Sequence, residues 1–188
     1  MLQGYYLVAN DNDSYIQEEF YNKEICECEN FVFNREKYLN EDIVITKKDL
    51  DCSYTYDGYF IVSKEFMQFY EKSNFIGLKF FKINEKYDLY YAKASKSIEF
   101  DSERRKTKFL EFNKKCAMFN EVVGATPICL KDKNKINNGF FKTDVLFGRG
   151  YSQSPFLIVD VDTGKKLKKE KFKGLQLKEV LSKYEWEK

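Results

Sequence analysis

The sequence predicts an α+β protein in which a mixed or mainly antiparallel sheet carries two or three short helices. Short runs rich in Val, Ile, Phe and Tyr alternate with polar turns, which is typical of strands. Two of these runs are followed by apolar residues at helical spacing. The 188 residues suffice for one domain with a sizeable core, and 43% hydrophobic residues exclude disorder for most of the chain.

The first strand is expected at residues 5–9, where apolar and aromatic residues precede a turn-forming segment at 10–14. Residues 15–58 are harder to assign because they are mostly polar. Two short apolar runs within them, at 31–33 and 43–46, are candidate strands.

From residue 59 the pattern is clearer. A β-rich run at 59–62 ends at Ser63, which stands where a helix N-cap belongs. The helix is expected to end near 72–74, and its apolar stripe consists of Phe66, Phe69 and Tyr70.

The remaining elements alternate in the same way. The charged residues 101–105 are expected to connect two strands, and residues 162–164 to form a turn or cap before a short helix. Pro127 places its strand at a sheet edge, because proline cannot donate to a neighbouring strand. The expected strands are 76–83, 87–92, 98–100, 108–112, 126–130, 156–159 and 175–180.

An internal repeat relates residues 60–83 to residues 157–180, without a gap. Each copy reads as a strand, a short helix and a second strand led by Gly77 or Gly174. These glycines would allow a positive φ or a close backbone approach. Duplication or equivalent packing would explain the match. We therefore expect a single domain, 1–188, with the alternative of two similar strand–helix–strand lobes, 1–100 and 101–188.

The chain contains no histidine, which excludes Ser-His-Asp triads, Cys-His dyads and histidine-ligated metals. Its five cysteines are an odd number in a chain without an export signal, and we expect them to be reduced and buried. Cys26 and Cys28 form a C-x-C pair, but no pair of C-x-x-C motifs is present. The residues at 160–164 resemble part of a calcium loop, but Lys171 stands where such a loop needs Glu. We expect neither a metal nor a cofactor.

Charge is distributed unevenly along the chain. Residues 1–60 contain thirteen acidic and five basic residues, although the whole chain has a net charge of +2. Lysines cluster at 165–173, where Leu167, Phe172 and Leu175 interrupt them at spacings that suit a helix packed on a sheet. The lysines are therefore expected to form the solvated face. The separation indicates a charged partner surface, two solvated faces, or two ends that pack together. The acids of the N-terminal cluster are Asp11, Asp13, Glu18, Glu19, Glu24, Glu27 and Glu29.

Membrane insertion is not expected, because the longest apolar runs are far shorter than the roughly 18 residues that a spanning helix needs. The N-terminus lacks the basic and apolar regions of a signal peptide. These features predict a cytoplasmic protein.

Seven segments between residues 60 and 177 follow one another in a recognisable order. They are F-I-V-S-K-E-F at 60–66, I-G-L-K-F at 76–80, L-Y-Y-A at 89–92, F-D-S at 100–102, G-F-F-K-T-D-V-L-F-G at 139–148, S-P-F-L-I-V at 154–159 and F-K-G-L-Q-L at 172–177. With these segments, residues 59–180 resemble a group of bacterial immunity proteins from polymorphic toxin systems. The first 58 residues match least.

This resemblance implies a non-catalytic inhibitor that binds one cognate protein toxin, whose identity it leaves open together with the oligomeric state. It supplies no catalytic residues. The acidic cluster is our predicted contact, because a toxin with a basic groove would attract it. One alternative is a small cytosolic enzyme that uses carboxylate or Ser/Lys chemistry. The other is a nucleic-acid-binding module built on 165–173, although no aromatic-interleaved basic platform accompanies these lysines.

Overall fold

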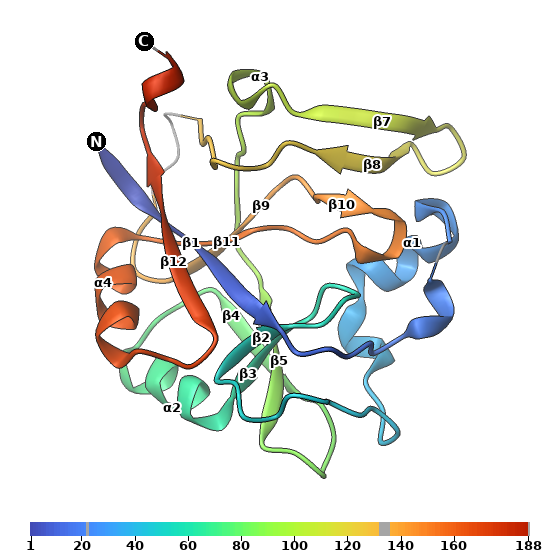
Figure 1. The fold of residues 1–188 in the computed structure, drawn as a ribbon, viewed down its shortest axis with the longest axis vertical. Helices are drawn as coiled ribbons and strands as arrows, with labels where there is room; N and C mark the ends of the chain where they lie inside the picture. Colours follow the sequence, from blue (N-terminus) through green and yellow to red (C-terminus); the bar gives the residue numbers. More distant parts are fainter. Residues whose placement is uncertain (22, 132–135, 188) are drawn as a thin grey trace.

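A computed structural model describes residues 1–21, 23–131 and 136–187. Its strands and helices are arranged in a mixed sheet with helices on its flanks (Figure 1), which confirms the predicted α+β class. The strands are β1 (Leu2–Asp11), β2 (Cys52–Tyr54), β3 (Phe60–Ser63), β4 (Leu78–Lys82), β5 (Leu89–Ala94), β6 (Ser97–Ile98), β7 (Lys108–Asn113), β8 (Met118–Val123), β9 (Phe140–Thr143), β10 (Gly148–Arg149), β11 (Leu157–Val159) and β12 (Leu175–Leu181). The α-helices are α1 (Ile25–Phe33), α2 (Lys64–Lys72), α3 (Ser102–Arg105) and α4 (Val161–Glu170), and short 3-10 helices cover Glu18–Phe20, Arg35–Tyr38, Gly150–Ser152 and Glu185–Glu187.

The larger sheet has nine strands and branches at β1. Its main path runs β4-β5-β3-β2-β1-β11-β9-β6. Tyr5 pairs with Val159 of β11 and with Glu179 of β12, so β1 runs between these two strands. The β1–β2 and β6–β9 pairs are parallel and the others antiparallel, so the sheet is mixed and contains strands from both halves of the chain. A second sheet has the order β10-β8-β7.

The two repeat segments have the same strand–helix–strand topology. In the first, β3 and β4 both pair antiparallel with β5, which lies between them. In the second, β11 and β12 flank β1 in the same way. Gly77 and Gly174 both have positive φ, and a Cβ at either would come within 3.0 Å of a backbone oxygen. The conformations predicted for these glycines are therefore confirmed, whereas duplication of one ancestral segment stays a prediction.

The helices α2 and α4 lie side by side on the same flank of the molecule (Figure 1). Ser63 caps α2 as predicted, because its hydroxyl accepts a hydrogen bond from the Phe66 amide at 3.2 Å. The Phe66 ring lies 5.1 Å from the Phe172 ring, which follows α4. Gly164 brings α4 onto β1, because any side chain there would collide with the Tyr5 ring. Aromatic packing thus joins both repeat segments in one core cluster.

Two expected strands in the N-terminal region are wrong. Residues 31–33 end the helix α1, which begins in a capping box formed by Glu24 and Glu27. Residues 43–46 do not form a strand. Ile43 and Ile45 are buried, but the Thr46 amide donates to the Ser14 hydroxyl instead of to a neighbouring strand. Each run therefore contains two buried apolar residues, but Phe33 and Val44 are exposed, and neither run forms a strand.

Further along the chain, the strand expected at 126–130 is wrong, because these residues contribute only one bridge, between Leu130 and Phe100. The charged residues 101–105 do connect two strands, β6 and β7, as predicted. This connection contains α3, whose first turn is capped by the Asp101 carboxylate. The strands β2 and β8 were not predicted.

Two of the cysteines form a disulfide, although the sequence predicted that all five would be reduced. Cys26 of α1 and Cys116, which precedes β8, form a disulfide, so the prediction of reduced thiols is wrong for these two. The sequence separation of 90 residues hid their proximity. Cys52 and Cys129 are free and buried, as predicted.

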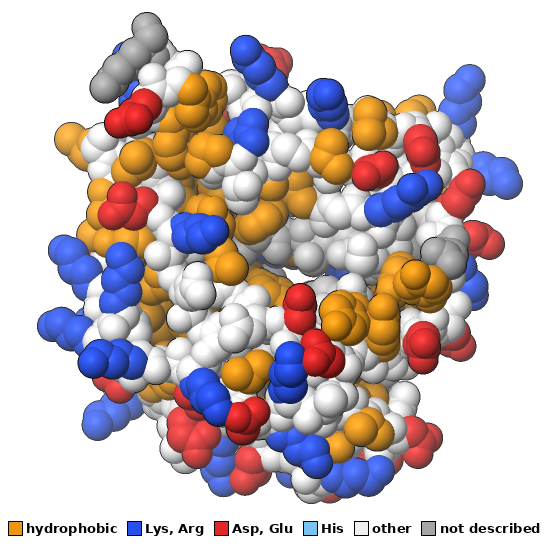
Figure 2. All heavy atoms as spheres, in the orientation of Figure 1, with side chains coloured by type: hydrophobic (Ala, Val, Ile, Leu, Met, Phe, Trp, Pro, Cys, Tyr) orange, Lys and Arg blue, Asp and Glu red, His pale blue; other side chains and the backbone are white. Residues whose placement is uncertain are grey.

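On the face that Figure 2 shows, charged side chains of both signs are interspersed with apolar ones around a hollow near the centre. Within the described ranges, no helix combines the length and apolarity needed to cross a bilayer.

Candidate functional site

Four tyrosines surround a depression of about 490 Å³ on the molecular surface. Tyr15 contacts Tyr56 and Tyr21, with ring centroids 5.0 and 6.3 Å apart, and Tyr21 also contacts Tyr151 at 6.0 Å. Tyr21 is 56% exposed, whereas Tyr151 is buried at the base. Lys23, Arg149, Gly150 and Ser152 also line the depression. We call Tyr15, Tyr21, Tyr56 and Tyr151 the tyrosine surface.

Two buried charged residues hold the tyrosine surface in place. The Asp57 carboxylate accepts hydrogen bonds from the Ile16 and Gln17 amides at 2.9 and 2.8 Å, which fixes the chain after Tyr15. The Arg35 guanidinium donates to the carbonyls of Asp57 and Tyr151 at 3.0 and 3.1 Å. Segments far apart in the sequence are thereby tied together beneath the tyrosine rings.

Three of the predicted acidic residues lie beside this surface. The Tyr56 hydroxyl donates to the Asp13 carboxylate at 3.0 Å, and Asp13 also pairs with Lys47 at 2.7 Å. Both interactions lower the pKa of Asp13, and the hydrogen bond from Lys47 contributes more than the one from Tyr56. Asp11 and Asp13 line one neighbouring hollow, and Asp13 and Glu18 line another.

The other predicted acids are distributed differently. Glu24 and Glu27 form the capping box of α1, and the Glu24 carboxylate also accepts a hydrogen bond from Asn113 at 3.0 Å. These two side chains therefore have a structural task. Glu19 and Glu29 are exposed, in the Glu18–Phe20 turn and on α1. Sequence reasoning did not select Asp42 and Asp49, although they line the hollows beside Asp11, Asp13 and Glu18.

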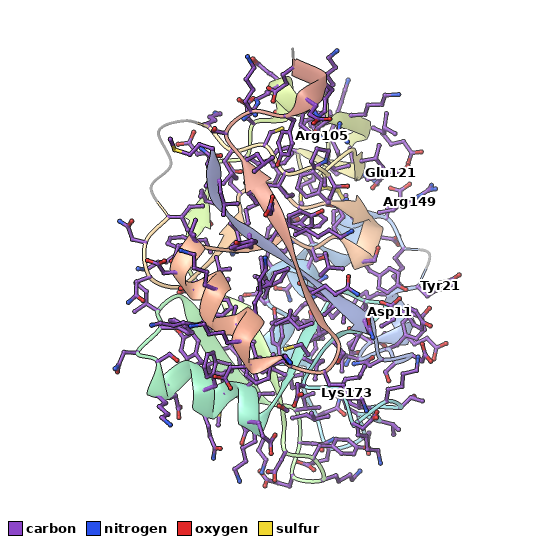
Figure 3. All side chains as sticks on the ribbon, turned by 60° about the vertical axis from the view of Figure 1, so that its left-hand side comes forward. Asp11, Tyr21, Arg105, Glu121, Arg149 and Lys173 are labelled. Atoms are coloured by element: carbon purple, nitrogen blue, oxygen red, sulfur yellow. A yellow bond between two sulfur atoms is a disulfide. The ribbon has the colours of Figure 1, made fainter. Side chains whose placement is uncertain are left out.

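An exposed hairpin, β7–β8, continues the surface beyond Arg149. Arg149 lies 3.7 Å from the Glu111 carboxylate of β7 and pairs in register with Glu121 of β8. Phe112, 53% exposed, packs against Phe119 with ring centroids 5.0 Å apart. Figure 3 shows Tyr21, Arg149 and Glu121 along the same side of the molecule.

The Lys-rich segment forms the solvated face of α4, as predicted, because Leu167 is buried while the α4 lysines are exposed. Its last lysine, Lys173, pairs with Asp49, and the Lys173 amide donates to the Asp51 carboxylate at 2.8 Å. The acidic and basic ends of the chain therefore meet at this point. This observation supports the alternative that part of the charge separation reflects internal pairing.

Sequence reasoning missed the tyrosine surface as a unit. Its members lie at positions 15, 21, 56 and 151, and three of them fall in the polar region that was hard to assign. The available signal was the number of tyrosines, fourteen, because such abundance indicates that some reach the surface.

Among the residues that the structure describes, no three Cys, Asp or Glu side chains gather as metal ligands would. Comparison of the chain with protein-family models, curated proteins and solved structures found no match.

Proposed function

We propose that this chain is a non-catalytic immunity protein that binds and neutralises a cognate bacterial toxin in the cytoplasm. The observation that carries the proposal is the tyrosine surface with Asp11, Asp13 and Glu18 beside it. The resemblance of residues 59–180 to immunity proteins supplies the class of partner.

The chemistry of this surface suits a protein partner. Tyrosine is enriched at protein interfaces because it offers a large apolar ring and a polar tip. The nearby carboxylates would attract a basic toxin groove, such as that of a nuclease, and would raise the association rate. A standard interface covers about 800 Å² on each partner, so the contact has to extend from the depression to the acids and to the β7–β8 hairpin.

The proposal expects the gene immediately upstream to encode a protein with a C-terminal toxin domain, and the test uses that domain. The full chain is co-expressed with this domain, growth is measured, and association is followed with purified proteins. The wild-type chain should restore growth and bind. Tyr21→Ala should accelerate dissociation roughly tenfold or more, because the exposed ring is removed from the contact.

Charge reversal tests the acidic part separately. Glu18→Lys combined with Glu19→Lys should slow association about tenfold at low salt. The matched control is Glu65→Lys with Glu71→Lys on the exposed face of α2, which changes the net charge equally. If both double variants associate with the toxin at the same rate, the acidic contact is refuted. If the wild-type chain neither binds the toxin nor restores growth, the pairing with this toxin is refuted.

A further inference from the structure

A half-enclosed cavity of about 200 Å³ lies where strands β3 and β5 separate. The pairing of β3 with β5 ends at Ile61–Tyr91, whereas β3 continues to pair with β2 and β5 continues to pair with β4. The C-terminal end of α1 covers one side of the gap, and β9 and β11 form the opposite side. None of these residues belongs to the tyrosine surface.

Lys142 of β9 lines this cavity on the same face of its strand as the buried Phe140. Its side chain is half-buried, and no carboxylate among the described residues lies within ion-pair distance of its ammonium group. Burial, and secondarily the charge of Lys93, lowers the pKa of Lys142, while Glu36 acts in the opposite sense. An ammonium group in this position gains from an anionic partner.

The other charges around the cavity are already paired or hydrogen-bonded. Lys93 donates to the Glu36 carboxylate at 2.6 Å and to the Phe33 carbonyl at 3.0 Å. The Arg35 guanidinium donates to backbone carbonyls, and none of the ion pairs between described residues includes it. Asp144 accepts a hydrogen bond from the Phe100 amide at 2.9 Å. The charged side chains Arg35, Lys93, Lys142, Glu36 and Asp144 leave a net positive charge of one.

The rest of the lining combines apolar side chains with phenol groups. Phe60, Ala92 and Leu157 provide an apolar floor. Tyr54 and Tyr91 also line the cavity, and burial raises the pKa of Tyr91 to about 12 and that of Tyr54 further. Both phenols therefore stay protonated at neutral pH and can donate hydrogen bonds.

We propose that this cavity binds a small organic carboxylate, whose charged end pairs with Lys142 and whose apolar chain lies against Phe60, Ala92 and Leu157. A few converging polar groups above an apolar floor are the usual composition of a small-molecule site. The volume holds on the order of seven water molecules, so the ligand has roughly seven to ten non-hydrogen atoms. This proposal does not rest on toxin binding, since no member of the tyrosine surface lines the cavity.

The experiment titrates the full chain with hexanoate, hexanamide and inorganic phosphate, and follows backbone amide signals by NMR. Hexanoate should saturate with a Kd on the order of 1 mM or tighter. The shifted signals should come from residues near Tyr54, Tyr91 and Lys142. Hexanamide and phosphate should each bind at least about tenfold more weakly, since one lacks the charge and the other the apolar chain.

Lys142→Met should weaken hexanoate binding at least about tenfold, whereas Lys79→Met, at an exposed position of β4, should leave it unchanged. The proposal is overturned if hexanoate does not saturate, if the shifts map to the α4 lysines, or if hexanamide or phosphate binds equally well. Equal affinity of the Lys142→Met protein also overturns it. If that variant does not fold, as judged by circular dichroism, the titration and mapping on the wild-type chain decide.

Discussion

Replacement of Arg35 by lysine should destabilise the fold strongly, although the charge is kept. Arg35 is only 3% exposed, and its guanidinium makes five hydrogen bonds to the carbonyls of Val32, Asp57, Tyr151 and Gln153, at 2.8 to 3.1 Å. These carbonyls belong to α1, to the turn before β3 and to the segment before β11. The side chain therefore joins three parts of the structure.

The magnitude follows from the geometry of the two side chains. A lysine ammonium has three donors on one nitrogen and cannot reproduce the planar fork of a guanidinium. At least two buried carbonyls would lose their donor, each at a cost of about 1–3 kcal/mol. We therefore expect Arg35→Lys to lower the free energy of unfolding by about 2–5 kcal/mol.

Urea denaturation followed by circular dichroism measures this loss. The control is Arg149→Lys, because the Arg149 side chain is 69% exposed and its carboxylate neighbour lies 3.7 Å away. The control should change stability by less than about 0.5 kcal/mol. If the free energy of unfolding of Arg35→Lys also lies within about 0.5 kcal/mol of the wild-type value, the structural role assigned to the guanidinium is refuted.

Two further predictions concern the backbone and the C-terminus. Gly174→Ala should lower the free energy of unfolding by about 2 kcal/mol or more in urea denaturation, because Gly174 has a positive φ and the new Cβ would collide with the Cys52 carbonyl. The control is Gly124→Ala, also at a positive φ but with no atom nearer than 3.7 Å, which should cost only about 1 kcal/mol. Equal losses of stability in the two variants would contradict the collision. The Arg104 guanidinium, which donates to both Glu187 carboxylate oxygens, lowers the pKa of Glu187 to about 2. The ionised Glu187 carboxylate therefore stabilises the folded state at pH values above the usual glutamate pKa. This stabilisation is lost as the pH falls from about 4.5 towards 2. Trp186 fluorescence should change over that interval, and Glu187→Gln should show the acid-state emission at pH 7; an unchanged spectrum in the variant would refute the tether.

Local patterns predicted the repeat segments well, because their signals act over a few residues. Ser63 caps the helix that its position indicated, and Gly174 adopts the positive φ expected before a strand. The region before residue 59 was misread for a physical reason. The run at 31–33 has the β-branched and aromatic composition of a strand, but the capping box at Glu24 starts a helix that extends through it. Cap chemistry outweighed composition there.

The candidate sites depend on contacts that no local pattern encodes. Tyr151 reaches the other tyrosines because Arg35 binds its carbonyl, across a separation of 116 residues. Lys142 lines the cavity because its strand pairs with β11 in a register that puts it on the face of Phe140. A sequence supplies the residue types for such sites, whereas the pairing of distant strands decides which of them meet.

The repeated topology also explains where these sites lie. In the first repeat segment the strand between β3 and β4 is β5, which follows directly in the chain; in the second, β1 from the beginning of the chain takes that place. The two units are connected through β2, which pairs with β3 of the first and with β1 of the second, and residues of β5 and of β11 both line the cavity. The tyrosine surface is built mainly from the segment between β1 and β3, outside both repeats. Residues 12–59 also supply β2 and the buried Arg35, so the segment that carries most of the tyrosine surface is itself part of the fold.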